Sequence, residues 1–287
     1  MFKEILLIVL LSAFATTFCG CSVSTDVSFH KSTYNETKES TNSSSPFGWN
    51  EVKVSILNQT AHAMLLKSIL PMPGTVNSTF FVSQPVLISL TTMASRMDSI
   101  DDTITNLLQA RLVPTVIYLF ISREPFLMDT GVKQIPKDLL CLVAAGYLRI
   151  VYTQNIGPHR KLLPLLKRHW GEDVFIATMD DDMELDQSHV ILYQLLKYYV
   201  KGGGGNCMVS LRARRIGICK EKPFKTTPYR TWTVTYNYNR NETLVLPTGN
   251  GGVLYKPAFF HPVVFDRAFI TLTKTTDDMA FRLATLI

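Results

Sequence analysis

The stretch "VLISLTTMASRMDSIDDTITNLLQARLVPTVIYLFIS" at residues 86–122 contains two apolar runs with an amphipathic segment between them. The runs 86–90 and 115–122 are short and rich in β-branched residues, as buried strands are. Between them, Ile100 and Ile104 belong to a set of apolar residues at helical spacing. The stretch therefore predicts a strand, a helix and a second strand, which is the repeating unit of an α/β domain.

The same alternation continues along the rest of the chain. Apolar runs predict further strands at 148–153, 173–179 and 207–211, and helical spacing predicts helices at 159–170 and 188–200. Pro164 interrupts the first of these helices, and the glycines at 202–205 end the second. We expect an α/β domain with a mainly parallel central sheet flanked by helices. Ligands of such domains bind beyond the carboxyl ends of the strands.

Three consecutive aspartates follow directly after the predicted strand 173–179, in "FIATMDDDMEL". Carboxylates at close quarters raise one another's pKa, and a divalent cation relieves this repulsion. Carboxylate oxygens suit Mn²⁺ or Mg²⁺, which also bridge a diphosphate. We expect a metal site in which Asp180 and Asp182 project to the same side of an extended segment and Asp181 projects to the other.

An acidic cap at a helix N-terminus is the ordinary explanation for a run of aspartates, because the helix dipole favours negative charge there. The buried strand before Asp180 favours the metal site instead, since it places the carboxylates where α/β domains bind ligands. The histidines at 159, 169, 189 and 261 do not have the spacing of metal ligands and are expected to be structural.

The first 24 residues are expected to be a targeting segment. Residues 5–23 carry no charge, and this length is at the lower edge of a membrane-spanning helix. A cleaved signal peptide and an uncleaved signal-anchor both fit, with a slight preference for the anchor. A lipoprotein linked through Cys21 fits less well. Entry into the secretory pathway is expected in either main case, with a lumenal catalytic domain at the Golgi or ER membrane.

Residues 25–82 are expected to form a flexible glycosylated stem, and residues 83–287 the catalytic domain. The stem begins with a polar stretch that has too little apolar surface to fold alone. Glycosylation acceptor patterns occur at Asn35, Asn42, Asn58, Asn77 and Asn241. Outside the apolar N-terminus the cysteines are Cys141, Cys207 and Cys219. In an oxidising lumen we expect one disulfide and one buried thiol, and Cys207 and Cys219 are the closest pair in sequence.

The overall composition is that of a globular protein with a mild basic excess. Hydrophobic residues make up 46% of the chain and charged residues 18%, and the net charge is 29 − 23 = +6. This excess fits an anionic ligand such as a nucleoside diphosphate, or a negatively charged membrane surface. The basic residues are scattered, with one compact group at Arg212, Arg214 and Arg215, so we do not expect nucleic acid as a partner.

Several segments together resemble, in order, a GT-A-fold glycosyltransferase domain, which has a Rossmann-related sheet. The quoted stretch 86–122 is similar to its opening nucleotide-binding region, and "TMDDDMEL" to its D-x-D metal motif. "QNIGPHRKLLPLL" is similar to a Gly-Pro-x-x-Lys segment of a bacterial and algal branch. "LPTGNGGVLYKPAFF" and "TTDDMAFRLATL" resemble the acceptor-side wall and a late acidic motif. The ordered set, which covers about residues 83–287, is specific, whereas no single segment is.

The resemblance implies a hexosyltransferase that moves a sugar from a nucleotide-sugar donor to a glycan, protein or lipid acceptor. Asp180 and Asp182 would hold Mn²⁺ or Mg²⁺, and Asp181 would lie near the ribose or the sugar. The remaining implied contacts are Thr91, Thr92 and Arg96 for the base and ribose, Lys161 for the diphosphate, and Gly249, Gly251 and Gly252 for the sugar.

Ordinary explanations stay open at several of these positions. Arg96 fits an exposed surface residue equally well, Lys161 fits a solvated helix residue, and the glycines fit a plain turn before the strand "VLY". Asp277 and Asp278 are candidates for the base that deprotonates the acceptor hydroxyl. Either could instead cap the helix that follows. The sequence leaves open whether the transfer retains or inverts the anomeric centre.

Two features depart from the related branch. Asn155 stands where that branch usually has Asp, so no ionic role is expected there. The chain ends at Ile287, and a closing helix is expected to be missing. Two other functions compete with the transferase, namely a metal-dependent phosphoesterase and an inactive sugar-binding protein. The aspartates follow the fourth predicted strand rather than the first, which counts against the phosphoesterase, and two retained acidic sites count against the inactive protein.

Overall fold

The computed structural model describes residues 34–37, 46–69, 84–109, 115–183, 188–202, 207–219, 222–236 and 242–287. The expected targeting segment at 1–24 lies outside these residues, as do the acceptor patterns at Asn42, Asn77 and Asn241. Within the described part of the chain, no helix is both long and apolar enough to cross a bilayer.

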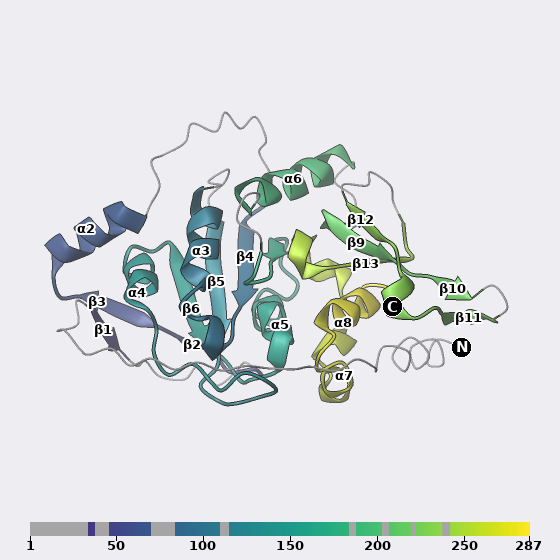
Figure 1. The fold of residues 1–287 in the computed structure, drawn as a ribbon, viewed down its shortest axis with the longest axis horizontal. Coiled ribbons are helices and arrows are strands. Elements are labelled where there is room, and N and C mark those ends of the chain that lie inside the picture. Colours follow the sequence, from purple (N-terminus) through teal and green to yellow (C-terminus); the bar gives the residue numbers. More distant parts are fainter. Residues whose placement is uncertain are drawn as a thin grey trace.

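The centre of the fold is a mixed sheet of seven strands (Figure 1). Its strands are β2 (Asn50–Glu51), β4 (Val86–Thr91), β5 (Thr115–Ile121), β6 (Leu148–Tyr152), β7 (Phe175–Thr178), β8 (Val209–Ser210) and β14 (Val253–Tyr255). They lie in the order β2-β6-β5-β4-β7-β14-β8. The four neighbours β6, β5, β4 and β7 are parallel, whereas β2 and β14 run antiparallel to the strands beside them.

Helices cover both faces of this sheet. Side chains alternate along β4, so that Ile88 and Leu90 join one buried cluster and Leu87 joins the other. The first cluster includes residues of α3 (Ile100–Gln109), α4 (Lys137–Ala144) and α6 (Ser188–Lys201). The second includes residues of α5 (Leu163–Arg168), α7 (Arg267–Leu272) and α8 (Asp277–Ala284). The domain is therefore a helix–sheet–helix sandwich with a core on each side of the sheet.

The α/β class, the four parallel strands and the helices between them confirm the sequence prediction. The sheet is more mixed than expected, because β14 enters antiparallel and the predicted fifth strand is only the two-residue edge strand β8. Pro164 does not interrupt a helix interior: it occupies the first turn of α5, where its missing N–H is not needed. α6 ends directly before Gly202, as predicted.

Part of the expected stem belongs to the folded domain, which corrects the predicted boundary. Phe47, Trp49 and Val52 are buried in the two cores, and β2 pairs with β6 at one edge of the sheet. The chain continues into β3 (Lys53–Ile56), which pairs with β1 (Tyr34–Thr37), and into α2 (Gln59–Ile69). Phe47, Trp49 and Val52 directly follow a polar stretch with few aliphatic residues, and the sequence therefore predicted that they belong to the stem.

A second, smaller sheet lies at the end of the molecule beside α8 (Figure 1). It consists of β9 (Arg212–Arg215) between β12 (Val234–Tyr236) and β13 (Val245–Pro247), all antiparallel. A hairpin of β10 (Ile218–Cys219) and β11 (Lys222–Thr226) extends beyond it. The sequence prediction did not include this sheet, because β9 carries three arginines in four residues and has no apolar alternation.

The cysteines differ from the expectation. Cys141, Cys207 and Cys219 are all free thiols, so the expected disulfide among these three cysteines is wrong. Cys141 is buried, as one of the three was expected to be, and its sulfur lies 3.5 Å from Nδ1 of His62 on α2.

Candidate active site

The carboxyl ends of the parallel strands bring three distant segments together. Asp180 follows β7, and β14 runs antiparallel to β7 with Val253 opposite Thr178. The turn Gly249–Gly251, which precedes β14, therefore lies beside Asp180. The N-terminus of α8 reaches the same place, since the backbone N–H of Gly249 donates to Oδ2 of Asp278 over 3.3 Å.

Lys161 is the centre of this cluster. Its ammonium nitrogen lies 2.9 Å from Oδ1 of Asp180, 2.6 Å from Oδ2 of Asp277 and 3.3 Å from Oδ1 of Asp278. The side chain is only 5% exposed. The 3₁₀ helix Gly157–Lys161 holds it in place, because Ser89 of β4 donates a hydrogen bond to the carbonyl of Lys161. We call Lys161 with its three aspartates the lysine-centred acidic cluster.

The charges in this cluster set the pKa values of its members. Burial alone lowers the pKa of Lys161, but Asp277, Asp278 and Asp180 outweigh burial and hold the pKa well above its usual value. Burial raises the pKa of Asp277, and the contact with Lys161 reverses this and lowers it. Burial together with Asp277 and Asp180 raises the pKa of Asp278 to about 6, despite Lys161. The pKa values of these two adjacent carboxyl groups are therefore shifted in opposite directions.

The late acidic pair does not cap α8. Thr276 occupies the N-cap position, and Asp277 and Asp278 lie in the first turn with their side chains directed to Lys161. Negative charge is favourable there because the helix dipole is positive at its N-terminus. The capping alternative for these two aspartates is therefore wrong.

Arg96 forms a second ionic group with the other two aspartates of the run. Its Nη1 lies 2.7 Å from Oδ1 of Asp181 and 3.2 Å from Oδ2 of Asp182. Thr92 donates to Oδ2 of Asp181 over 2.6 Å, and Thr103 donates to the Asp181 carbonyl over 3.2 Å. Asp181, with a side chain 9% exposed, is thus held from three directions, whereas the side chain of Asp182 is 56% exposed.

The expected extended geometry of the aspartate run is wrong. Residues 181 and 182 form a turn, so Asp181 and Asp182 approach the same arginine while Asp180 faces Lys161. Arg96 is partly exposed, and its guanidinium binds two aspartates of the run. Thr91 does not point into this group: its hydroxyl donates to the carbonyl of Phe120 on β5.

The glycines are required by the packing of the protein itself. A Cβ atom at Gly249 would lie 2.2 Å from Oδ1 of Asp180 and 2.6 Å from Nζ of Lys161. A Cβ atom at Gly251 would lie 2.6 Å from the backbone nitrogen of Arg212. Gly252 has φ +69°, which favours glycine. They form the turn before β14, and this turn packs directly against the lysine-centred acidic cluster.

A buried polar layer beneath the site was not predicted. Arg160, whose side chain is 3% exposed, donates to Oδ2 of Asp129 over 2.8 Å and to the carbonyl of Thr92 over 3.1 Å. Asn155 donates to the same Asp129 oxygen and to the carbonyl of Glu124, and accepts from the N–H of Gly157. This layer fixes the segments that carry Thr92 and Lys161. The available signal in the sequence was Arg160 next to Lys161, directly before the apolar run 162–166.

Asn155→Asp is expected to destabilise the protein. The change removes the amide donor to Glu124 and places a second carboxylate beside Asp129 in a buried site. We expect a loss of roughly 1–3 kcal/mol in the free energy of unfolding, measured by urea denaturation at neutral pH. Asn50→Asp, at an exposed position, is the matched control. Equal stability of the two variants would contradict this role of Asn155.

Two histidines have structural roles. His159 is buried, with Nε2 3.0 Å from the hydroxyl of Thr273, and burial lowers its pKa to about 4. It therefore stays neutral near neutral pH. Nδ1 of His261 accepts from the backbone N–H of Val263 at the start of a short 3₁₀ helix.

The site offers some of the ligands that a divalent cation needs. Asp180 and Asp182 supply carboxylate oxygens, and Asp182 is accessible. Both are already paired with cationic side chains, and among the described residues no group of three or more acidic, histidine or cysteine side chains is arranged to hold a metal ion by itself. Mg²⁺ is commonly held by one or two carboxylates together with substrate phosphates, and such an arrangement needs no closed protein cage.

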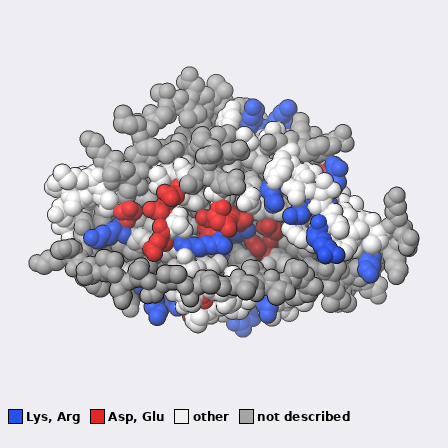
Figure 2. All heavy atoms as spheres, in the orientation of Figure 1, with Lys and Arg blue, Asp and Glu red and all other residues white. Residues whose placement is uncertain are grey.

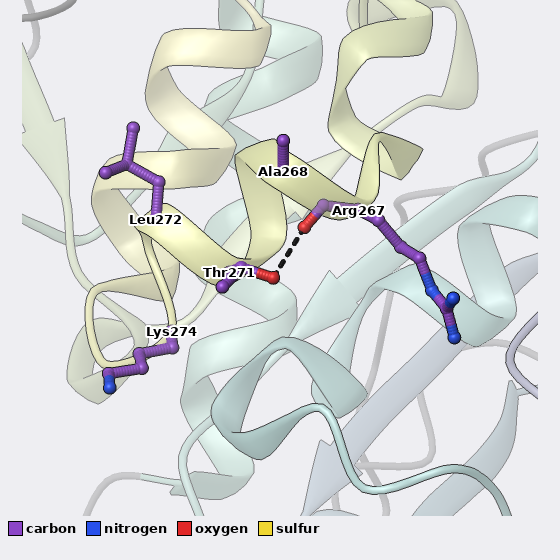
Figure 3. Close-up of a pocket in the computed structure, with 5 residues that line it drawn as sticks. All are labelled: Arg267, Ala268, Thr271, Leu272 and Lys274. Atoms are coloured by element: carbon purple, nitrogen blue, oxygen red, sulfur yellow. Dashed lines mark hydrogen bonds between the residues drawn. The ribbon is translucent and has the colours of Figure 1, made fainter.

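One face of the molecule carries both signs of charge. Figure 2 shows acidic side chains gathered in the middle of one face, with a row of basic side chains next to them. More basic side chains lie over the end of the molecule that carries the small sheet. A separate pocket on α7 is lined by Arg267, Ala268, Thr271, Leu272 and Lys274 (Figure 3). None of these lining residues belongs to the lysine-centred acidic cluster.

No protein-family model and no curated protein matches the chain.

Proposed function

We propose that this protein is a glycosyltransferase that moves a sugar from a nucleotide-sugar donor to a glycan, protein or lipid acceptor. The observation that carries this proposal is the convergence of two acidic segments, almost a hundred residues apart, at the carboxyl ends of parallel strands. Asp180 and the pair Asp277–Asp278 meet there around Lys161. This is the edge at which α/β domains bind their ligands.

The two acidic segments suit different tasks. Asp278 is the better candidate for the base that accepts the proton of the acceptor hydroxyl. Its pKa of about 6 leaves it ionised at neutral pH and close to the optimum for proton transfer, and its side chain is 26% exposed. Asp277 is less exposed and its pKa is lowered by Lys161, so its task is to hold the lysine.

On the donor side, Asp180 and Asp182 would hold Mn²⁺ or Mg²⁺. When bound, the cation would stabilise negative charge on the departing diphosphate. Thr92 and Arg96 orient Asp181, which leaves that aspartate as a fixed acceptor for a ribose or sugar hydroxyl. The role expected for Lys161 changes: with three carboxylates around it, it positions acidic groups rather than neutralising a diphosphate.

The proposed setting is the lumen of the secretory pathway, with Golgi or ER membrane attachment through the N-terminal segment. Of the glycosylation acceptor patterns, Asn58 lies on the described surface. It is exposed, and its side-chain oxygen accepts from the N–H of Ala61 at the start of α2. The nitrogen that would carry a glycan is not used in this contact.

A metal-dependent phosphoesterase is the second candidate. A carboxylate beside a buried ammonium, with a further acidic pair next to it, also suits phosphoryl transfer through an aspartyl intermediate. The two candidates differ in what they release. The transferase yields a nucleoside diphosphate only from a nucleotide sugar, whereas the phosphoesterase releases inorganic phosphate from simple phosphate esters.

The test is a screen of nucleotide sugars with the purified full chain and Mn²⁺, reading thermal stabilisation and release of nucleoside diphosphate. We expect one donor to respond, and we expect removal of the metal by chelation to abolish the response. Asp182→Asn should lower turnover at least about a hundredfold, because it removes an accessible metal ligand. Asp98→Asn, an exposed aspartate outside the acidic groups, should leave turnover unchanged.

A folded protein that responds to no donor would refute the transferase. Release of inorganic phosphate from p-nitrophenyl phosphate, lost in Asp180→Asn, would establish the phosphoesterase instead.

A further inference from the structure

The cations next to the acidic site differ in whether a carboxylate neutralises them. Lys161, Arg96 and Arg160 each bind aspartate. Arg212 and Arg214, on β9, have no carboxylate partner within the described part of the chain. The third arginine of this strand, Arg215, is paired with Glu242. Two arginines beside the site therefore carry positive charge that the described residues do not compensate.

These two arginines share one face of the small sheet with aromatic side chains. Arg212 pairs across the strands with Tyr236, and its guanidinium lies 5.9 Å from the centre of that ring. The guanidinium of Arg214 lies 4.7 Å from the ring centre of Tyr229. Tyr236 and Tyr229 are exposed, at 64% and 38%. We call Arg212, Arg214, Tyr229 and Tyr236 the basic–aromatic strip.

The strip leads to the candidate base. Nη1 of Arg212 donates to the hydroxyl of Thr248 over 2.6 Å, and the next residue, Gly249, donates from its backbone to Asp278. Arg214 lies two residues further along β9, about 6.6 Å away along an extended strand. A row that extends away from the base fits an elongated acceptor better than a compact diphosphate.

We propose that the basic–aromatic strip binds an acidic glycan acceptor, one that carries carboxylate, sulfate or phosphate groups. The guanidinium groups pair with these anions, and the tyrosine rings offer flat apolar faces to the sugar rings. This inference rests on the proposed transferase function, because it places the acceptor hydroxyl near Asp278. It adds the chemical class of the acceptor, which the acidic cluster alone does not indicate.

Calorimetric titration of the full chain, without donor or metal, tests the strip independently of turnover. We expect an oligogalacturonate to bind and the neutral maltotetraose to bind much more weakly, with affinity for the former falling as salt is raised. Arg212→Met and Arg214→Met should each weaken binding about tenfold. Arg215→Met is the matched control, since it lies on the same strand, faces the other side and should leave the affinity unchanged.

Four outcomes would overturn the proposal: equal binding of the neutral saccharide, equal loss in Arg215→Met, tighter binding of single-stranded DNA, or no saccharide binding by a folded protein. A titration with a nucleoside diphosphate separates the donor site from the acceptor site. If binding of the nucleoside diphosphate depends on Arg212, this arginine belongs to the donor site. If the saccharide binds as expected and the protein responds to no nucleotide sugar, the proposed transferase function is wrong and the proposed role of the basic–aromatic strip is supported. If a donor turns over without saccharide binding, only the strip fails.

Discussion

Replacing Lys161 by methionine is expected to lower the free energy of unfolding by about 3–5 kcal/mol at neutral pH. The substitution keeps most of the volume of the side chain and removes the ammonium that three buried or half-buried aspartates share. Without it, Asp277 retains no cationic partner among the described residues and is left as an uncompensated charge. Urea unfolding of the variant, followed by circular dichroism, measures the loss.

The loss should shrink as the pH is lowered. In the variant the folded state raises the pKa of its acidic residues and takes up protons that the unfolded chain does not, so stability rises as pH falls. In the wild type, Lys161 lowers the pKa of Asp277, whose stabilisation is lost on acidification. The difference between the two proteins therefore shrinks as the pH falls from 7 toward 4 because the variant gains stability, and the contribution of Asp277 to the wild type is lost only below about pH 4. A loss that does not depend on pH would contradict charge compensation as its cause.

The control for this experiment is Lys133→Met, which removes a lysine at an exposed position. We expect it to change stability by less than about 0.5 kcal/mol. If Lys161→Met behaves in the same way, the lysine is an ordinary solvated residue, which is the explanation that the sequence left open.

The strands and helices of the large sheet were predictable because their apolar periodicity is strong. Residues 86–90 and 173–179 are almost wholly apolar, and Ile100 and Ile104 lie on the buried face of α3. The small sheet was not predictable, since β9 is stabilised by cross-strand pairing and by stacking of its arginines on tyrosines rather than by apolar alternation. A pattern that counts apolar residues does not detect such a strand.

The position of Asp180 at a strand end was predictable, whereas the partners of the three aspartates were not. The sequence placed Asp180 at a strand end correctly, because that follows from the buried run before it. It assigned Asp180 and Asp182 to one side, but the chain turns at 181–182 and gives them different cationic partners. It also missed the buried pair of Asp129 and Arg160, since contacts between residues far apart in sequence depend on the tertiary fold.

Asp278→Asn is expected to lower the turnover number by roughly a hundredfold to ten-thousandfold, because it removes the proposed general base. The same change should not destabilise the protein. The pKa of Asp278 is raised to about 6, so the folded state disfavours its ionised form at neutral pH. A neutral amide removes this penalty, and we expect the free energy of unfolding to rise by up to roughly 3 kcal/mol at pH 7.

Asp277→Asn is the matched control, and its effect on stability has the opposite sign. Lys161 lowers the pKa of Asp277, so the ionised form stabilises the fold and its removal should lower the free energy of unfolding. The measurements are urea unfolding of both variants and the pH profile of the turnover number. The wild-type rate should rise as the pH passes through about 6, because the base must be ionised to accept a proton. Full turnover of Asp278→Asn would show that Asp278 is not the base of the transfer. A loss of stability in this variant would show that the carboxylate serves the fold.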